Sequence, residues 1–201
     1  MPLHQFEKDN VELVEVVNLP SILGKDTKFF LFKRINEYIS VLAKGDVFRK
    51  ENVLCRIHSE CMFGDIFGSK KCDCGEQLAK AKQLIANEEY GILFYLAQEG
   101  RGIGLMNKTK AYKLQEQGYD TVEANMELGY VPDLRDYNAC AVILKDYFKI
   151  TSVRLLTNNL KKSAPLKEKG ISVVLMPIKI EPNEHNKTYL TTKKAKMGHK
   201  I

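Results

Sequence analysis

The chain has 201 residues, of which 44% are hydrophobic and 28% are charged, and its formal net charge is +6. These are ordinary values for a globular protein, so they exclude a wholly disordered chain, and the length suits the single domain that we expect over residues 1–201. The mild positive charge fits an anionic small-molecule substrate as well as it fits nucleic acid.

Four short strands are predicted in the first sixty residues, because four segments there are rich in β-branched and aromatic residues. Polar turns such as Gly24-Lys25-Asp26 and Lys44-Gly45-Asp46 separate them. The four predicted strands are Val11–Asn18, Lys28–Lys33, Tyr38–Ala43 and Asn52–Ser59.

From Gly75 onward the pattern changes to helices that alternate with strands. Leu78, Ala81 and Ile85 form one apolar stripe at helical spacing, and a glycine-rich segment at 100–104 leads into a helix that Gly118 ends. The further predictions, in chain order, are a strand at Gly91–Ala97, a helix at Asp136–Phe148, a strand at Val153–Leu156, a helix at Lys161–Lys169, a strand at Ile171–Met176 and a basic helical tail from about Glu184.

This alternation favours an α/β fold, a layered mixed sheet with helices on both faces and an antiparallel N-terminal extension. The apolar run from Tyr90 to Ala97 is too short to span a membrane, and the polar start MPLHQFEKDN has no apolar signal core. We therefore expect no membrane segment and a cytoplasmic location. Thiols stay reduced there, so cysteines that lie close together indicate metal binding or reactivity rather than disulfides.

Three of the five cysteines follow the pattern Cys61-x10-Cys72-x-Cys74. Thiolates are preferred zinc ligands, and three of them leave one tetrahedral position open for water, as in a catalytic site. Two alternatives stay open, namely His58 as the fourth ligand of a closed structural site and a redox pair of Cys72 and Cys74. We expect the other two cysteines, Cys55 and Cys140, to be buried in the core.

Three thiolates also carry more negative charge than a zinc ion carries positive charge. A water molecule on such an ion would be less acidic than one held by three histidines. The cysteine pattern therefore predicts a base or a cation close to the metal.

Several segments, in order along the chain, resemble the GTP cyclohydrolase II family. The resemblance runs from about residue 10 to the C-terminus, and six or more motifs in the right order make it specific. The segments are Arg56-Ile-His-Ser-Glu-Cys61, Gly64-Asp65, Lys71-Cys-Asp-Cys-Gly75, Gln98-Glu-Gly-Arg-Gly-Ile-Gly-Leu105, Lys110-Ala-Tyr112, Gln117-Gly-Tyr-Asp-Thr-Val-Glu-Ala-Asn125, Asp133-x-Arg-Asp-Tyr137, Arg154-Leu-Leu-Thr-Asn-Asn159 and Lys196-Met-Gly-His199.

The resemblance implies hydrolysis of GTP to formate, pyrophosphate and 2,5-diamino-6-ribosylamino-4(3H)-pyrimidinone 5′-phosphate, which opens riboflavin biosynthesis. It also implies a homodimer that uses zinc and magnesium. The chain is too short for the second synthase domain fused to some family members, so we expect a monofunctional enzyme.

The same resemblance implies the roles of individual residues. The implied metal ligands are Cys61, Cys72 and Cys74, and the implied GTP contacts are Arg56, Ile57, His58, Ser59, Glu60, Gln77, Glu99, Gly100, Arg101, Thr121, Thr157 and Lys162. Among these, Gln77 and Glu99 suit the guanine base and Arg101 suits the triphosphate, because a guanidinium binds phosphate oxygens in pairs. Leu160 stands where the family commonly has proline, which removes no ligand.

The implied catalytic residues are Tyr112, Asp133 and Arg135. The family uses Asp133 as proton acceptor and Arg135 as nucleophile at the α-phosphate, but a guanidinium stays protonated near neutral pH, so electrostatic stabilisation is an alternative role for Arg135. Without the resemblance, Tyr112 would be a core residue, Asp133 a helix N-cap and Thr121 a turn or N-cap residue.

Two other functions remain open at this point. One is a zinc-stabilised module that binds GTP without turnover. The other is binding of single-stranded nucleic acid by the basic tail Lys193–Lys200, which no interleaved aromatic residues support, so we expect no nucleic-acid partner.

Overall fold

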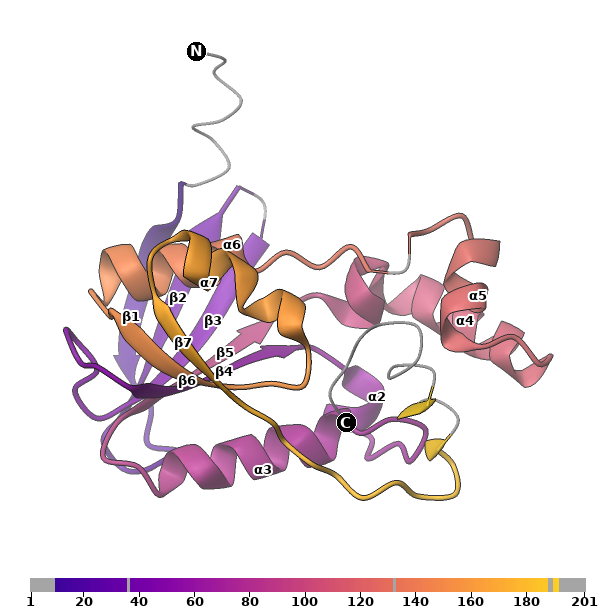
Figure 1. The fold of residues 1–201 in the computed structure, drawn as a ribbon, viewed down its shortest axis with the longest axis horizontal. Helices are drawn as coiled ribbons and strands as arrows, with labels where there is room; N and C mark the ends of the chain where they lie inside the picture. The colour runs from indigo at the N-terminus through magenta and orange to yellow at the C-terminus, as the bar shows by residue number, and fades with distance from the viewer. Residues whose placement is uncertain (1–9, 36, 132, 188–189, 192–201) are drawn as a thin grey trace, which may run out of the picture.

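A computed structural model describes residues 10–35, 37–131, 133–187 and 190–191. Seven strands form one sheet in the order β1-β2-β3-β5-β4-β6-β7 (Figure 1). Their bounds are β1 Glu12–Asn18, β2 Thr27–Arg34, β3 Glu37–Lys44, β4 Val53–Ser59, β5 Gly91–Leu96, β6 Ser152–Leu156 and β7 Ser172–Met176.

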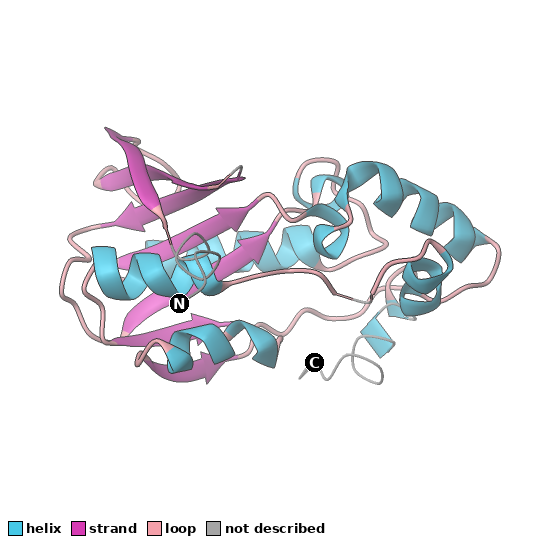
Figure 2. Ribbon diagram, turned by 90° about the horizontal axis from the view of Figure 1, so that it is seen from above, coloured by secondary structure: helices cyan, strands magenta, loops and turns pink. Residues whose placement is uncertain are grey.

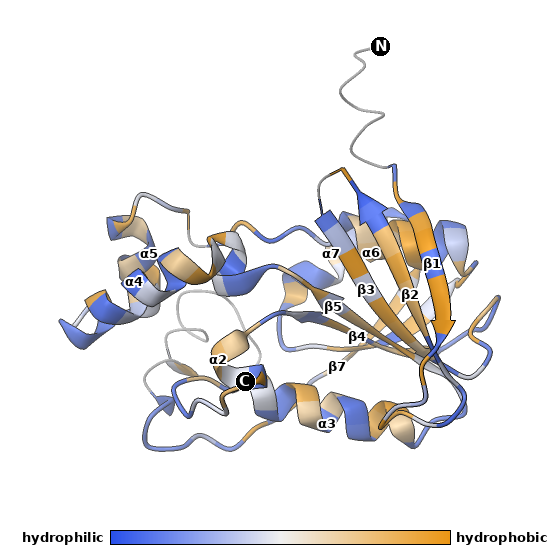
Figure 3. Ribbon diagram, turned by 180° about the vertical axis from the view of Figure 1, so that it is seen from behind, coloured by the Kyte–Doolittle hydropathy of each residue, from blue (hydrophilic) through white to orange (hydrophobic). Residues whose placement is uncertain are grey.

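The first three strands form an antiparallel meander, and β3 then pairs antiparallel with β5. In β2 the side chains alternate, so Phe30 and Phe32 are buried while Lys28 and Lys33 are exposed. Figure 3 shows apolar residues along the outer strand β1 as well, where Leu13, Val14 and Val17 are exposed. This half of the sheet confirms the predicted antiparallel extension.

The other half of the sheet is parallel. Strand β4 pairs with β5 on one side and β6 on the other, and β6 pairs with β7. Strand β4 is buried on both faces, with only its last residue, Ser59, partly exposed. Because β4, β5 and β6 run in the same direction, the loops that follow them leave the sheet at one edge.

Helices cover both faces of the sheet, as predicted (Figures 1 and 2). Helix α3 (Cys74–Ala86) packs its Leu78, Ala81 and Ile85 stripe on one face, against Leu54 and Leu93. The opposite face carries α6 (Asn138–Val142), the π-helix Ile143–Tyr147 that continues it, and α7 (Ala164–Glu168). The predicted helices at 136–148 and 161–169 are thus each present in two pieces, the second as a 3₁₀ turn at Leu160–Lys162 followed by α7.

Helices α4 (Gly104–Glu116) and α5 (Thr121–Glu127) lie together beyond the edge at which β4 and β5 end (Figure 1). In the described part of the chain, two short α-helices, α5 and α2 (Met62–Asp65), and a 3₁₀ turn at Glu99–Gly102 have no counterpart in the predictions. Helix α5 begins at a capping box in which the Asp120 carboxylate accepts from the backbone N–H of Glu123 and the Glu123 side chain accepts from that of Asp120.

Cys55 and Cys140 are fully buried in the core, as predicted. The basic tail Lys193–Lys200 lies outside the described residues. Within the described part of the chain, no helix is long and apolar enough to cross a membrane.

The fold makes a prediction about stability. Phe94 lies in the middle of β5 with no exposed surface, inside the larger apolar cluster. We expect Phe94→Ala to lower the free energy of unfolding by about 3–5 kcal/mol, because it removes buried apolar surface and leaves a cavity. Urea denaturation measures this, with Ile22→Ala as the control because Ile22 is 74% exposed. A loss equal to that of the control would contradict the assigned core.

Candidate active site

An open pocket lies at the edge where the parallel strands end, and it brings together most of the predicted site residues. These are Arg56, His58, Ser59, Glu60, Cys61, Cys72, Cys74, Gln77, Glu99, Gly100, Arg101, Tyr112, Thr121, Arg135, Thr157 and Lys162. Two predicted residues do not line it. Ile57 is buried in the core, and Asp133 lies behind Arg135.

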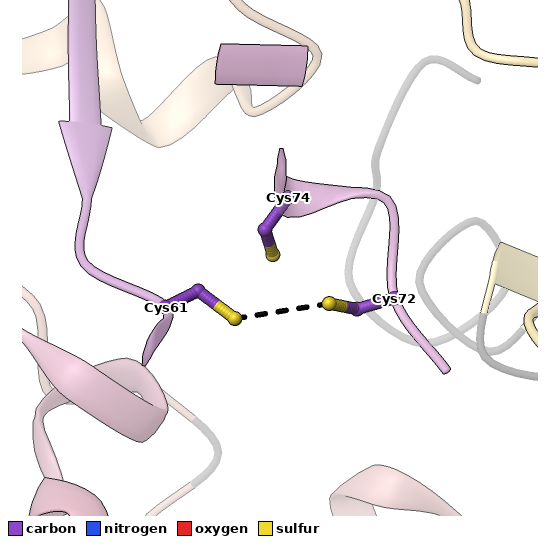
Figure 4. A group of neighbouring side chains, drawn as sticks. All are labelled: Cys61, Cys72 and Cys74. Carbon is purple, nitrogen blue, oxygen red and sulfur yellow. Dashed lines mark hydrogen bonds between the residues drawn. The ribbon is translucent and has the colours of Figure 1, made fainter. Parts of the chain in front are cut away.

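The thiols of Cys61, Cys72 and Cys74 converge at one side of this pocket (Figure 4). Their three Sγ atoms all lie within 4.8 Å of one another, and those of Cys61 and Cys72 are 3.7 Å apart. Two thiolates on one tetrahedral zinc ion, at about 2.3 Å each, would lie roughly 3.8 Å apart. The donor set and its spacing therefore fit a zinc ion.

Two glycines let the cysteine segments approach each other. Cys61 is the N-cap of α2 and accepts a hydrogen bond from the Gly64 N–H, while Cys74 is the first residue of α3. A Cβ atom on Gly75 would overlap the carbonyl oxygen of Gly64, and one on Gly64 would lie 2.9 Å from the Cys72 Sγ. The three thiols can converge only because both positions lack a side chain.

Electrostatics within the cluster favour a thiolate at Cys61. Its pKa lies well below the usual value because Cys72 and Cys74 donate hydrogen bonds to it, and the nearby Lys108 ammonium adds to the effect. The hydrogen bond to Cys61 also raises the pKa of Cys72, to about 11. No disulfide joins any of the five cysteines.

His58 is not placed as a fourth ligand. Its Nε2 lies 3.0 Å from an Asp65 oxygen, and its Nδ1 lies 3.3 Å from Nη2 of Arg56. Because arginine only donates, Nδ1 accepts, so the ring is neutral and Nε2–H donates to Asp65. Burial lowers the pKa of His58 to about 4.

Asp65 is the centre of a buried polar network. Besides His58, its carboxylate accepts hydrogen bonds from the Tyr95 hydroxyl at 2.9 Å and from the backbone N–H of Cys61 at 3.0 Å. The side chains of His58 and Asp65 are each only 3% exposed. This network fixes the orientation of the imidazole and the position of Cys61 together.

Arg56 joins three elements beneath the pocket. Its Nη1 donates to the Leu156 carbonyl at 2.9 Å, and its Nη2 donates to Gln77 Oε1 at 2.8 Å. Burial lowers the pKa of Arg56 to about 10, and its Nε has no hydrogen-bond partner. Arg56 and His58, two residues apart, share one face of β4, while Glu60 lies just beyond the strand and lines the same pocket.

Glu99 anchors the loop after β5 to the cysteine loop. One carboxylate oxygen accepts from the backbone N–H of Met62 at 2.7 Å, and the other accepts from the Gly100 N–H at 3.0 Å and from Lys108 Nζ at 2.6 Å. Lys108 Nζ also lies 3.1 Å from the Cys61 Sγ. Burial lowers the pKa of Lys108, but the hydrogen bonds that its ammonium donates to Glu99 and Cys61 outweigh this effect. The pKa therefore lies above its usual value.

The next two residues have unusual backbone conformations. Gly100 and Arg101 have φ angles of 62° and 65°, in the left-handed region that glycine tolerates and arginine does not favour. The Arg101 Nη2 donates to Thr121 Oγ1 at 3.1 Å, and its buried Nη1 has no partner. Thr121 is the first residue of α5, whose cap is Asp120, so it is not an N-cap.

Arg135 and Asp133 form a bidentate ion pair. The Nε and Nη2 atoms of Arg135 each lie 2.8 Å from one oxygen of Asp133. Although burial opposes ionisation, these bonds hold the pKa of Asp133 below its usual value. Asp133 is thus not a helix N-cap, because α6 starts after Tyr137.

Thr157 and Lys162 lie at the end of β6 and in the turn that follows. Thr157 Oγ1 accepts from the Asn159 N–H at 3.0 Å, and Lys162 Nζ donates to the carbonyl oxygen of Ile57 at 2.7 Å. Ile57 thus takes part in the site through its backbone. Tyr112, on α4, packs its ring edge-on to Phe63, with centroids 5.2 Å apart.

The pocket also contains residues that the sequence reasoning did not select. They are Gln98, Ile103, Lys108, Ala111, Gln115, Asn125, Asn158 and Asn159. Lys108 had a signal in the sequence, because it lies four residues before Tyr112 and therefore on the same face of α4. Four others, namely Gln98, Asn125, Asn158 and Asn159, stand in the segments that carry the family resemblance, whereas Gln115 is distinguished only by its place in the fold.

Comparison with known proteins gives a consistent result. Residues 12–176 match the protein family described as GTP cyclohydrolase II. The chain is 58% identical over 157 residues to the riboflavin biosynthesis protein RibBA of Bacillus subtilis (strain 168), across 77% of this chain and 39% of that protein. It is 52% identical over 201 residues to RibBA of Staphylococcus haemolyticus (strain JCSC1435), across 98% of this chain and 50% of that protein.

The chain therefore spans half or less of the length of these curated relatives. Among solved structures, it is similar to RibBX, a two-domain 3,4-dihydroxy-2-butanone 4-phosphate synthase from A. baumannii, with a TM-score of 0.47 and 16% identity over 89% of this chain and 43% of that chain. A likeness this weak has no bearing on function.

The contact between Gly64 and Gly75 predicts the effect of one added methyl group. We expect Gly75→Ala to separate the two cysteine segments and to lower the bound metal by at least about tenfold, as the loss of supporting contacts around metal ligands does. Metal content after purification measures this. Glu76→Ala, at the next position of α3, is the control because the Glu76 side chain is exposed. Full metal content in Gly75→Ala would contradict the close packing.

Because the His58 imidazole is buried and neutral, we expect the free energy of unfolding to depend on pH. The pKa of His58 is about 4 in the folded chain against 6.5 ordinarily, so the unfolded chain binds more protons between these values. Lowering the pH from 6.5 to 4 should cost the metal-free protein roughly 3 kcal/mol from this group. The free energy of unfolding across this range should fall less steeply in His58→Gln. Equal slopes would show that His58 is not held neutral.

Proposed function

The chain belongs to the GTP cyclohydrolase II family, and we propose that it hydrolyses GTP to 2,5-diamino-6-ribosylamino-4(3H)-pyrimidinone 5′-phosphate, formate and pyrophosphate, the first step of riboflavin biosynthesis. The observation that carries this proposal is the convergence of three thiols with the cationic side chains of Arg101, Arg135 and Lys162 on one pocket. The names of the RibBA relatives support the pathway.

Zinc is the proposed metal, held by Cys61, Cys72 and Cys74. The soft donor set and the 3.7 Å separation of two thiols support it. When bound, zinc would activate water for opening the imidazole ring of guanine and for release of formate. The remaining chemistry belongs to the residues around it.

The guanidinium groups would bind the triphosphate. Arg101 brings a buried Nη1 without a partner, and Arg135 lines the pocket with its guanidinium held by Asp133. We favour Arg135 as an electrostatic stabiliser of the α-phosphate during water attack, because its bidentate bond to an ionised Asp133 keeps the guanidinium protonated. If Arg135 were instead the nucleophile, Asp133 is the group within reach to take its proton.

The base would lie nearer the thiols. Gln77, Glu99 and the neutral His58 offer hydrogen-bonding groups that suit the edge of guanine. Tyr112, whose ring packs against Phe63 of the cysteine loop, would hold through its hydroxyl the oxygen that water adds to carbon 8 of guanine. Ser59, Glu60, Gly100, Thr121, Thr157, Lys162 and the backbone of Ile57 complete the proposed GTP contacts.

Other parts of the proposal rest on the family resemblance. They are magnesium bound with the triphosphate, a homodimer, a cytoplasmic location and one catalytic domain over residues 1–201. Sedimentation of the purified chain measures the mass of the assembly, and magnesium titration at fixed GTP measures the cation requirement.

The proposal is tested by incubating zinc-loaded protein with GTP and magnesium and measuring formate and pyrophosphate together. Equal yields of both products are expected. GTP binding without either product would favour a non-catalytic GTP-binding module and contradict the enzyme.

Removal of one thiol separates the two reactions. We expect Cys72→Ser to lose zinc and to lower formate release by at least about 100-fold, more than the loss of a supporting residue costs. Pyrophosphate release should fall much less, because the phosphate-binding residues are unchanged. Cys140→Ala, a buried cysteine outside the cluster, is the control. Normal formate release by Cys72→Ser would contradict the metal assignment.

A further inference from the structure

We propose that Lys108 is a positioning residue for the metal centre, one that holds the Cys61 thiolate by hydrogen bond and offsets the excess negative charge of the three cysteines. This inference rests on the proposed zinc-dependent function. It concerns a residue that neither the motifs nor the charge pattern singled out.

The position of the ammonium is the first argument. Lys108 Nζ lies 3.1 Å from the Cys61 Sγ and 2.6 Å from a Glu99 oxygen, and its side chain is only 9% exposed. The ring of Phe63 covers the ammonium, with its centroid 4.6 Å away. A buried ammonium costs free energy unless such partners surround it, so the site is built to keep this charge in place.

The charge of the cysteine cluster is the second argument. Three thiolates carry one more negative charge than a divalent ion carries positive charge, and the sequence led us to expect a cation nearby. Lys108 supplies that cation directly at a ligand atom. A hydrogen bond to a metal-bound thiolate withdraws electron density from the sulfur, which leaves the metal a stronger Lewis acid.

The connection to the substrate loop is the third argument. Glu99, which holds Lys108, also accepts from the N–H of Met62, the residue after Cys61. The ammonium and this carboxylate therefore clamp the loop after β5 to the loop that carries the first thiol. Helix α4 provides Lys108 on the same face as Tyr112, so the rigid helix sets the distance between the thiol and the proposed catalytic tyrosine.

Cobalt substitution gives a test that does not depend on turnover. In Co²⁺-loaded protein, the thiolate-to-cobalt charge-transfer band reports the electron density on sulfur, and the ligand-field bands report the coordination geometry. We expect Lys108→Met to keep the ligand-field bands and to move the charge-transfer band to lower energy. Lys108→Arg, which keeps the charge, should leave the band close to its wild-type position.

Matched variants separate charge from folding. Lys113→Met, on the exposed face of the same helix, should leave the spectrum unchanged, since the Lys113 side chain is 73% exposed. Lys108→Gln removes the charge but keeps a polar group in the buried site. Its charge-transfer band therefore tests the proposal even if Lys108→Met does not fold. A charge-transfer band at the wild-type position in Lys108→Gln or Lys108→Met would overturn the proposal.

Product analysis with zinc then tests the consequence for the reaction. We expect the ratio of formate to pyrophosphate to fall about 10- to 100-fold in Lys108→Met and to recover in Lys108→Arg. An unchanged ratio would overturn the role in ring opening. If the wild-type chain releases neither product, the proposed function fails, while the cobalt spectra still decide whether Lys108 bonds the thiolate.

Discussion

The parallel pairing of β4 with β5 and β6 is the constraint on which the site depends. It brings three loops, distant in sequence, out of the sheet at one edge, where they carry the thiol of Cys61, the guanidinium of Arg101 and the ammonium of Lys162. The N-terminal meander takes no part in the pocket but covers the other side of β5, so that the strand is buried. The location of the candidate site thus follows from the common direction of these three strands.

Buried polar groups then fix the loops relative to one another. Asp65, Arg56 and Glu99 each form hydrogen bonds with at least two segments. Arg56 and Glu99 line the pocket, and Asp65 holds His58, which also lines it. Burying these groups costs free energy that the apolar clusters on the two faces of the sheet must supply. A pocket assembled this way is already ordered before a ligand arrives, which lowers the entropy lost on binding.

Much of this arrangement could be predicted from the sequence. The strand and helix pattern gave the sheet and both helix layers because apolar periodicity is a local property, and the spacing of Cys61, Cys72 and Cys74 indicated the metal site. The role of His58 could not be predicted, because it depends on Asp65 and Arg56 contacting opposite ring nitrogens. Lys108 was missed although a cation was expected, since a lysine on a helix is ordinarily solvated. Helix α5 was missed because it is short and its capping box was not recognised. Which residues bind GTP remains a prediction.

The left-handed backbone at Arg101 carries a consequence for how this protein tolerates change. A side chain in that region costs roughly 1–2 kcal/mol relative to glycine, so the chain gives up stability to present a guanidinium at this point. Selection for thermal resistance alone would therefore favour glycine at residue 101 and would erode the pocket. A stabilised variant of this protein has to gain its extra stability elsewhere, in the core or at the exposed apolar surface of β1.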